Sequence, residues 1–289
     1  MRDLIKRLKY YLRYILISDE KYIKYKFKKY FGYELNLENP KTLNEKIQWL
    51  KLNDRTPLHT KCADKFLVRE YIKEKIGEKY LVPLIFDTFN PKDINKNTLP
   101  DFPVVVKVNH ARGVFLINDK NTTNFEDIQK KLGKELKTNF YYRTREWQYK
   151  NIKPRIIVEK MLLDKNNNIP DDYKFICING EIAFIQVDMN RFNGHKKTIY
   201  DKYWNKQNFG FNYPIGDDVE KPITLEKMVH IAELISKNFC FIRVDFYTFD
   251  DEIFIGELTF HPAGGFGKFD PEEIDLELGT KLNLGIINE

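Results

Sequence analysis

The sequence predicts an α+β protein whose helices come first and whose antiparallel sheet lies mainly in the second half. Three features of the chain indicate this fold class. Residues 1–76 show the apolar spacing of amphipathic helices, residues 80–117 contain short β-branched runs, and residues 155–258 are mainly strand-like. Hydrophobic residues make up 42% of the 289 residues, which is enough for a sizeable core, and no internal repeat or flexible linker interrupts the pattern.

Residues 1–31 form the first predicted helical region, which is strongly basic. Leucine, isoleucine and tyrosine recur at helical spacing, lysine and arginine occupy the other faces, and Ser18 or Asp19 can cap a second helix. Two interpretations stay open. The segment rests on anionic lipid as a peripheral membrane contact, or it packs on its own domain with its lysines in water. The sequence favours the second.

Residues 39–76 are predicted to be helical in two pieces, with a break at Thr56-Pro57. Thr42 followed by Glu45 is a capping-box pattern in front of an apolar run, so it predicts a helix start. Residues 64–75 have the spacing of a second amphipathic helix.

Strand-like runs follow from residue 80 onward. In the first group, residues 80–86, 102–108 and 114–117 are predicted strands, and residues 124–138 return to helical spacing. In the second group the predicted strands are residues 155–162, 173–178, 182–187, 241–247 and 253–258. Asn179-Gly180 predicts a tight hairpin turn, and residues 224–237 form a helix between the strand groups.

Lys107 stands at the end of a predicted strand, directly before a loop at residues 109–113. A lysine on a rigid strand beside a mobile loop can hold a nucleotide phosphate. Asn109, His110 and Gly113 can cover the phosphates with backbone N–H groups. Taken alone the pattern is weak, because a lysine before a turn is common.

The run Glu159-Lys160-Met161-Leu162 ends another predicted strand. Its backbone can offer a donor and an acceptor to the edge of a base, while Met161 and Leu162 line an apolar slot. Taken alone, an ordinary strand end is the simpler interpretation.

Two carboxylates are predicted to converge on one face of the last hairpin. Alternate residues of a strand share a face, so Arg243 and Asp245 point one way together, as do Glu257 and Thr259. If the two strands pair across a turn near residues 250–251, all four side chains meet. Two carboxylates so placed favour a bound cation such as Mg²⁺, and an exposed salt bridge explains the pattern equally well.

The runs Ile242-Arg-Val-Asp-Phe-Tyr247 and Ile255-Gly-Glu-Leu-Thr-Phe-His-Pro262 resemble the metal-binding hairpin of ATP-grasp enzymes. The whole chain more closely resembles the TupA-like ATP-grasp family, named for teichuronopeptide biosynthesis. The other matching stretches are Asn39-Pro-Lys-Thr-Leu-Asn-Glu-Lys46, Ala63-Asp-Lys65 with Val68-Arg69, Val106-Lys-Val-Asn-His110, Arg145-Glu-Trp147 with Tyr149, and Asp172-Tyr-Lys-Phe175. They occur in order from residue 39 to about residue 280, which is more specific than any single match.

The resemblance implies the ATP-grasp fold, in which two α+β subdomains hold ATP between two antiparallel sheets. It divides this chain into a basic helical segment at residues 1–38, a helical region at 39–100, a small subdomain with the phosphate loop at 101–160 and a large subdomain with the metal hairpin at 161–289.

The resemblance also implies roles for single residues, with ATP and Mg²⁺ as the cofactors. Lys107 would contact the α/β-phosphates under the loop at 109–113, Glu159 to Leu162 would read adenine, Lys174 would contact phosphate or substrate, Asp245 and Glu257 would bind Mg²⁺, and Arg243 would stabilise the tetrahedral intermediate. Two positions depart from the family pattern. Thr259 replaces the usual Asn and is a weaker metal ligand, and the loop His110-Ala-Arg-Gly113 has fewer glycines, so Arg112 itself becomes a candidate phosphate contact.

The implied activity is a Mg-ATP-dependent ligase that joins a carboxylate to an amine through an acyl phosphate. Its carboxylate would be a uronic acid or similar acidic saccharide, and its amine an amine or amino acid, during capsular or exopolysaccharide biosynthesis. Arg191, His195 and Lys196 lie in a basic stretch predicted as a loop, which could hold the acidic sugar or could simply be solvated. The alternatives are a sugar-phosphorylating ATP-grasp kinase, a non-catalytic polysaccharide-binding module and, less favoured, a glycosyltransferase.

Composition narrows the partners and the compartment. A net charge of +6 suits an anionic ligand but is too dispersed to indicate nucleic acid. Cys62, Cys177 and Cys240 are far apart and predict no disulfide framework, which favours the cytoplasm, with the inner face of the membrane as the peripheral alternative. No run approaches about 18 apolar residues, so no transmembrane helix is expected, and the N-terminus lacks a signal-peptide pattern.

Overall fold

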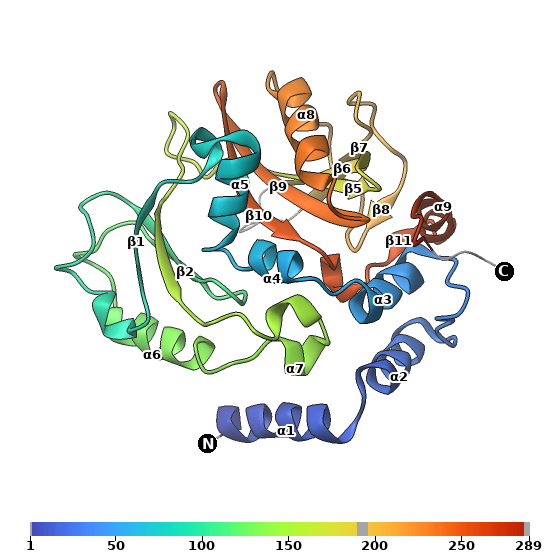
Figure 1. The fold of residues 1–289 in the computed structure, drawn as a ribbon. Coiled ribbons are helices and arrows are strands. Elements are labelled where there is room, and N and C mark those ends of the chain that lie inside the picture. The colour runs from blue at the N-terminus through green and yellow to red at the C-terminus, as the bar shows by residue number, and fades with distance from the viewer. Residues whose placement is uncertain (1, 190–195, 286–289) are drawn as a thin grey trace.

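The computed structural model describes residues 2–189 and 196–285, and two antiparallel sheets dominate this part of the chain (Figure 1). The five-stranded sheet contains, in spatial order, β10 (Glu252–Thr259), β9 (Phe241–Phe249), β5 (Asp172–Ile178), β6 (Glu181–Met189) and β7 (Lys196–Tyr200). The four-stranded sheet contains β1 (Leu84–Thr88), β4 (Ile156–Lys160), β2 (Val104–Val108) and β3 (Val114–Ile117). Two short strands, β8 (Gly210–Phe211) and β11 (Phe269–Asp270), pair separately. The predicted α+β fold class is confirmed.

Helices surround the two sheets. They are α1 (Arg2–Leu16), α2 (Asp19–Phe31), α3 (Leu43–Asn53), α4 (Pro57–Ala63), α5 (Val68–Ile76), α6 (Phe125–Glu135), α7 (Tyr141–Thr144), α8 (Leu225–Ser236) and α9 (Glu273–Lys281), with short 3₁₀ turns at Glu78–Tyr80, Pro91–Asp93, Trp147–Tyr149 and Pro262–Gly264. Within the described residues, no helix is long and apolar enough to cross a membrane.

The two faces of the five-stranded sheet are different because successive side chains of a strand point to opposite sides. On one face Phe175 and Val244 are buried in a core with Met228 of α8, which lies across the strands (Figure 1). Each large apolar side chain buried there contributes about 1.5–3 kcal/mol. Lys174 and Arg243 point to the other face. Since α8 holds the sheet from one side, the opposite face can carry charged groups.

The four-stranded sheet has the same division. On β2 the side chains of Val104, Val106 and Val108 are buried in a core that includes Leu132 of α6. The intervening Lys107 therefore points away from α6, toward the five-stranded sheet. The cavities described below lie on that side.

The predicted hairpin turn between β5 and β6 is confirmed. Asn179 and Gly180 have φ of 49° and 85°, and Ile178 pairs directly with Glu181. A two-residue turn with both φ values positive matches the right-handed twist of the strands.

The predicted single helix at residues 64–75 is wrong in its first turn. Helix α4 ends at Ala63, and the Asp64 carboxylate accepts hydrogen bonds from the backbone N–H groups of Phe66 (2.8 Å) and Leu67 (3.3 Å). This local bonding competes with helix formation, so α5 begins only at Val68. As a result Lys65 lies in the break between two helices.

The loop predicted around Lys196 is also wrong, because Lys196–Tyr200 form the edge strand β7. Thr198, Ile199 and Tyr200 are all buried, and the two lysines at the start of the strand obscured this pattern. The sequence also gave no signal strong enough to predict β8, β11 or α9.

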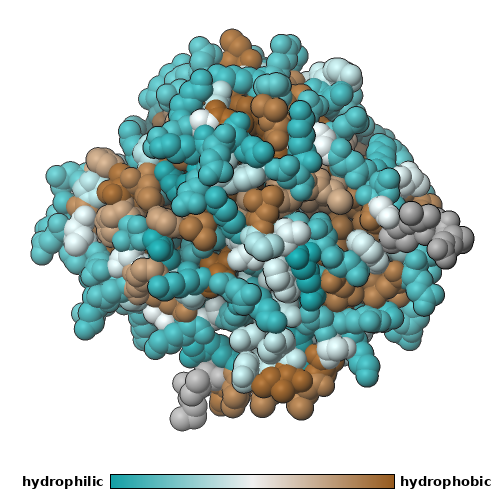
Figure 2. All heavy atoms as spheres, in the orientation of Figure 1, coloured by the Kyte–Doolittle hydropathy of each residue, from teal (hydrophilic) through white to brown (hydrophobic). Residues whose placement is uncertain are grey.

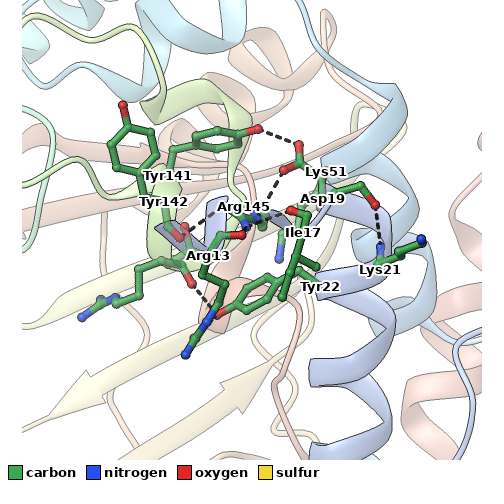
Figure 3. A network of polar contacts seen from close by, with 12 residues as sticks. Arg13, Ile17, Asp19, Lys21, Tyr22, Lys51, Tyr141, Tyr142 and Arg145 are labelled. Carbon is green, nitrogen blue, oxygen red and sulfur yellow. Dashed lines mark hydrogen bonds and ion pairs between the residues drawn. The ribbon is translucent and has the colours of Figure 1, made fainter. Parts of the chain in front are cut away.

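The N-terminal helices are fixed to α7 by a buried arginine (Figure 3). The guanidinium of Arg145 has no solvent exposure and donates hydrogen bonds to the carbonyls of Arg13 (3.2 Å) and Ile17 (3.3 Å). Tyr141 donates a hydrogen bond to Asp19 (2.6 Å) at the start of α2. Ser18 caps that helix by accepting from the N–H of Lys21, which confirms one of the two predicted caps.

Candidate active site

Two cavities meet on the charged face of the five-stranded sheet. The inter-sheet cavity, about 380 Å³, lies between this sheet and the four-stranded sheet. The sheet-face cavity, about 420 Å³, extends over β5, β6 and β7. The side chains that line both cavities are Lys65, Arg112, Val114, Lys174, Arg243 and Glu257. Five of these six are charged, so the junction can hold groups that carry or develop charge.

Much of the wall of the inter-sheet cavity is apolar. The apolar side chains that line it include Val82, Val105, Leu116, Met161, Leu162, Ile169 and Tyr247. Met161 and Leu162 therefore lie where the sequence placed an apolar slot, and Lys160 lines the same cavity. The backbone N–H groups of Lys160 and Met161 already donate to the carbonyls of Pro83 (2.9 Å) and Pro103 (3.0 Å), so neither is free for a base.

Glu159 is bonded to cations. Its carboxylate lies 2.7 Å from Nζ of Lys107 and 3.5 Å from Arg69. The carboxylate is buried, so it fixes the lysine side chain in the wall of the inter-sheet cavity. Sequence reasoning placed Lys107 and Glu159 near the same ligand but did not predict that they pair.

The loop at residues 109–113 is anchored by its first residue. Asn109 donates to Asp64 (2.9 Å) and to the carbonyl of Lys153 (3.0 Å), and it accepts from the N–H of Arg155 (2.8 Å). These bonds occupy the side chain, and Asn109 lines neither cavity.

The other residues of this loop have different positions: some pack against neighbouring segments, and others line a cavity. His110 bonds to Asn109 and to the carbonyl of Thr138, and burial lowers the pKa of its imidazole, which favours the neutral ring. Gly113 lines neither cavity, and a Cβ there would come within 3.1 Å of Glu135. Arg112 lines both cavities. In this loop, Arg112 is the side chain best placed to contact an anion.

The hairpin of β9 and β10 brings together the four residues that the sequence singled out. Glu257 pairs with Asp245 and Thr259 pairs with Arg243 across the two strands. Arg243 donates two hydrogen bonds to Asp245 (2.6 and 2.5 Å) and one to Glu257 (3.0 Å). The hydroxyl of Thr259 donates to Glu257 at 3.3 Å. The predicted geometry is therefore present, while the roles of these residues stay predictions.

The two carboxylates of the hairpin differ in acidity. Burial and the neighbouring Glu257 raise the pKa of Asp245 to about 7, although Arg243 opposes this shift. Burial would also raise the pKa of Glu257, but Lys65, Arg243 and Lys107 lower it to about 2. Glu257 is thus ionised at neutral pH, and a further positive charge near Asp245 would favour the ionised form of that carboxyl.

These carboxylates suit a hard cation. Mg²⁺ at nucleotide sites is commonly bound by one or two carboxylates together with phosphate oxygens and waters. Asp245 and Glu257 supply that number, and the described parts of the chain contain no group of three or more His, Cys, Asp or Glu side chains that could hold a metal ion. Both carboxylates form ion pairs with Arg243, so a metal ion bound there would share the Asp245 and Glu257 carboxylates with the guanidinium.

Lys65 is a site residue that sequence reasoning missed. Its Nζ lies 3.3 Å from Glu257 and 3.4 Å from the carbonyl of Ala111, and its N–H donates to the carbonyl of Asn109. Lys65 therefore connects the loop at 109–113 with the β9–β10 hairpin. A signal was present, since Ala63-Asp-Lys65 is one of the stretches that resemble the family.

Lys174 is held on β5 by two carboxylates. Its Nζ contacts Asp172 (3.0 Å) and Asp188, and Gln186 donates to Asp188 at 2.6 Å. Burial opposes ionisation of Asp188, but Lys174 and Lys197 hold its pKa below the ordinary value. Sequence reasoning identified Lys174 but not its partners. Asp172 shares a strand face with Lys174 by alternation, but Asp188 reaches that face only because the β5–β6 register shifts between Ile176 and Cys177, which the turn at 179–180 does not report.

Of the three residues predicted to hold an acidic sugar, the structure describes Lys196 alone. Arg191 and His195 lie outside the described residues. Lys196 lines neither cavity; its side chain is 54% exposed and pairs with Asp217 at 2.7 Å. The next residue of β7, Lys197, points to the opposite face of the five-stranded sheet and lines the sheet-face cavity.

Two antiparallel sheets with a cavity between them, closed by a strand pair that carries two carboxylates and an arginine, define the architecture of the ATP-grasp class. The chain belongs to the TupA-like ATP-grasp family, whose sequence model matches residues 45–283. The resemblance inferred from the sequence is thus confirmed. A search of curated proteins found no match.

Solved structures of ATP-grasp ligases show distant similarity. A D-alanine–D-alanine ligase from Bacillus anthracis, complexed with ATP, is 17% identical with a TM-score of 0.40, covering 68% of this chain and 53% of that one. An L-amino acid ligase from Bacillus licheniformis is 12% identical with a TM-score of 0.49, covering 85% and 58%. The ATP-grasp ligase PsnB, complexed with a precursor variant, Mg and ADP, is 11% identical with a TM-score of 0.42, covering 83% and 65%. This chain thus spans less than two thirds of each.

Proposed function

We propose that this protein is a ligase that uses ATP and Mg²⁺ to join a carboxylate to an amine through an acyl phosphate. The observation that carries the proposal is the meeting of two cavities at Lys65, Lys174, Arg243 and Glu257. A ligase of this kind must place a nucleotide and an acceptor on opposite sides of one charged junction. A protein that only binds polysaccharide needs neither the junction nor the paired carboxylates.

In this proposal the inter-sheet cavity takes ATP. Its apolar wall, with Val105, Met161 and Leu162, offers a slot for the planar base. Lys107, fixed by Glu159, faces the phosphates, where a lysine ammonium is a suitable point charge. Arg112 contacts the phosphates from the loop above.

Asp245 and Glu257 would hold Mg²⁺, with Thr259 as a weaker oxygen donor. An ion bound there would neutralise charge on the transferring phosphoryl group. The acceptor carboxylate attacks the γ-phosphorus, ADP leaves, and an amine then attacks the acyl carbon of the acyl phosphate and displaces phosphate. Arg243 and Lys174 face this region from the strands and would stabilise the oxyanion that develops.

The attacking amine must lose a proton, and Glu146 is a candidate acceptor. Its carboxyl is buried and lines the sheet-face cavity. Burial raises the pKa of Glu146, although Lys51 opposes the shift. A carboxylate with a raised pKa is a more effective base near neutral pH.

The sheet-face cavity supports an acidic saccharide as the carboxylate substrate. Lys174, Lys197 and Arg112 give it cationic groups, while Phe184, Phe211 and Phe241 give it aromatic walls. Cations bind a uronate and aromatic rings pack against the apolar face of a sugar. We therefore propose a uronic acid or similar unit of a cell-surface polysaccharide as the carboxylate and an amine or amino acid as the second substrate, with the reaction in the cytoplasm.

The test is calorimetric titration of the full chain with ATP, with and without Mg²⁺, in the wild type, in Glu257→Gln and in Asp251→Asn. Asp251 is an exposed carboxylate in the turn of the same hairpin, so it is the matched control. We expect Mg²⁺-dependent binding in the wild type and in Asp251→Asn, and binding weakened at least about tenfold in Glu257→Gln.

Either of two results would contradict the proposal. Wild-type protein that binds no ATP, alone or with uronic acids present, rules out the nucleotide site. Glu257→Gln protein that binds ATP and forms ADP as the wild type does rules out the metal assignment. If ATP binds and a phosphorylated sugar accumulates without an amide, the enzyme is a kinase.

A further inference from the structure

Helix α1 presents an apolar face to solvent. Five of its side chains are 47–78% exposed: Ile5, Leu8, Leu12, Ile15 and Leu16. At 3.6 residues per turn they occupy an arc of roughly 100°. Figure 2 shows the hydrophobic patch at the lower edge of the molecule, where Figure 1 places α1. Most amphipathic helices of globular proteins turn such a face inward, so this orientation requires a reason.

The opposite side of α1 is docked, which fixes the apolar face outward. Tyr14 stacks on Tyr142 with ring centroids 4.8 Å apart, and Arg7 donates to the carbonyl of Lys137 at 3.2 Å. Arg145 binds the carbonyls of Arg13 and Ile17 at the end of the helix (Figure 3). The helix therefore cannot roll to bury its leucines against the protein without breaking these contacts.

Positive charge accompanies the apolar face. Lys6 and Lys9 are exposed on α1. Residues 2–31 contain ten Lys and Arg and three Asp and Glu, a net charge of +7, whereas the whole chain has +6. The remaining chain is thus close to neutral, and essentially all the net positive charge of the protein lies in α1, α2 and the turn between them.

An apolar stripe bordered by lysines matches the surface of an anionic bilayer. Apolar side chains enter the boundary between headgroups and acyl chains, and the basic groups pair with lipid phosphates. A second copy of this chain fits the face less well, because two segments of +7 would then lie together. With 15 residues, α1 is also too short to span a bilayer, which takes about 20 residues.

We propose that α1 docks this protein on an anionic lipid surface, lying in the plane of the membrane with Ile5, Leu8, Leu12, Ile15 and Leu16 in the interface. This inference is independent of the proposed ligase function. It holds or fails whatever reaction the cavities catalyse.

The experiment is flotation of the full-length protein with vesicles made of an equal mixture of phosphatidylglycerol and phosphatidylcholine, and with vesicles of phosphatidylcholine alone. Two double variants are compared with the wild type. Leu8→Ser with Leu12→Ser removes the middle of the stripe. Ile223→Ser with Leu276→Ser removes two apolar side chains that are 83% and 50% exposed elsewhere on the surface.

We expect the wild type and the control variant to float with the anionic vesicles and not with the neutral ones. The α1 variant should bind at least about tenfold more weakly, and salt should weaken the binding of the wild type. Because the changed leucines are exposed, thermal unfolding should be the same for all three proteins. Wild-type protein that does not float, or equal losses in both variants, would overturn the proposal. Loss of self-association in the α1 variant without vesicle binding would assign the face to a second copy.

Discussion

The two sheets that enclose the inter-sheet cavity contribute unlike chemistry to it. The four-stranded sheet supplies apolar walls and two lysines, Lys107, which is already paired with Glu159, and Lys160. The five-stranded sheet supplies Lys174, Arg243, Asp245 and Glu257 from three adjacent strands. An apolar wall with a few cations can give affinity for a nucleotide. A dense array of paired charges can respond to charge that appears during a reaction, so we assign binding to the first sheet and chemistry to the second.

The cost of that array explains why it is so fully paired. Burying an ionised group without partners is expensive, and buried ion pairs lose much of this cost only when their hydrogen bonds are satisfied. Arg243 is bonded to both hairpin carboxylates, and Lys174 to two others. The α8 face of the same sheet is apolar, so the core holds these strands in register while the charged face is kept in a fixed geometry.

The largest effect on activity should come from Asp245→Asn in the five-stranded sheet, to which we assign the chemistry. The substitution keeps the size of the side chain but removes one of the two carboxylates proposed to hold Mg²⁺. The negative charge on the transferring phosphoryl group would then be neutralised less well. We expect ADP formation to fall at least about a hundredfold, measured with a coupled assay on protein that circular dichroism shows to be folded. Asp251→Asn should keep full activity. Equal activity of the two variants would contradict the assignment of chemistry to this sheet.

A smaller effect, on the affinity for ATP, should follow from Lys107→Met in the four-stranded sheet, to which we assign nucleotide binding. Loss of one charge-assisted contact to phosphate should weaken ATP binding about ten- to a hundredfold. Lys120→Met is the matched control, because Lys120 follows β3 of the same sheet and pairs with Asp101 away from both cavities. Calorimetric titration with Mg-ATP measures both. If ATP affinity is unchanged but turnover is lost, Lys107 acts in the chemical step. The assignment of binding to the four-stranded sheet and of chemistry to the five-stranded sheet is then wrong.

The acceptor side gives a third comparison, between neighbours on one strand. Lys197→Met should raise the KM for the acidic acceptor about tenfold without changing ATP affinity, because Lys197 lines the sheet-face cavity. Lys196→Met should have no effect, because that side chain is exposed and pairs with Asp217. Steady-state kinetics of both variants, measured with the carboxylate substrate found by screening, would distinguish these outcomes. The opposite result would support the substrate role that the sequence suggested for Lys196.

Sequence patterns predicted the strands and the hairpin for a physical reason. Period-2 alternation fixes which residues of one strand share a face, so Arg243 could be placed with Asp245, and Glu257 with Thr259. The two sets meet on one face because the β9–β10 register shifts between Ile255 and Glu257. The family resemblance covered the same residues and is confirmed. The fold class, the β5–β6 turn and the shared face within each strand of the hairpin were therefore within reach of sequence alone.

The missed residues depend on contacts between distant segments. Lys65 reaches Glu257 only because the Asp64 turn ends one helix before the next begins. Glu159 was assigned to the hinge, yet its carboxylate pairs with Lys107 because β4 lies beside β2. The direction of the α1 face depends on Arg145, which is more than 120 residues away along the chain. Periodicity does not report such pairings.

The smallest expected effect concerns Glu257 and the pH dependence of stability. Burial would raise its pKa, but Lys65, Arg243 and Lys107 lower it to about 2, from a usual value of 4.5. A carboxylate with a lowered folded-state pKa stabilises the fold above its unfolded pKa, and this contribution is lost as the pH falls from about 4.5 to about 2. Because 36% of the side chain is exposed, solvent screening limits the effect to about 1 kcal/mol.

Glu257→Gln should therefore lower the free energy of unfolding at pH 7, and the difference from the wild type should shrink at pH values below about 4.5. Urea unfolding at pH 7 and at about pH 3.5 measures this difference. Glu252→Gln, at the exposed start of the same strand, is the control and should show little change at either pH. A difference for Glu257→Gln that stays constant from pH 7 to pH 3.5 would mean that Lys65 and Arg243 do not stabilise the charged form, and the five-stranded sheet would then lack the electrostatic coupling that distinguishes it from its neighbour.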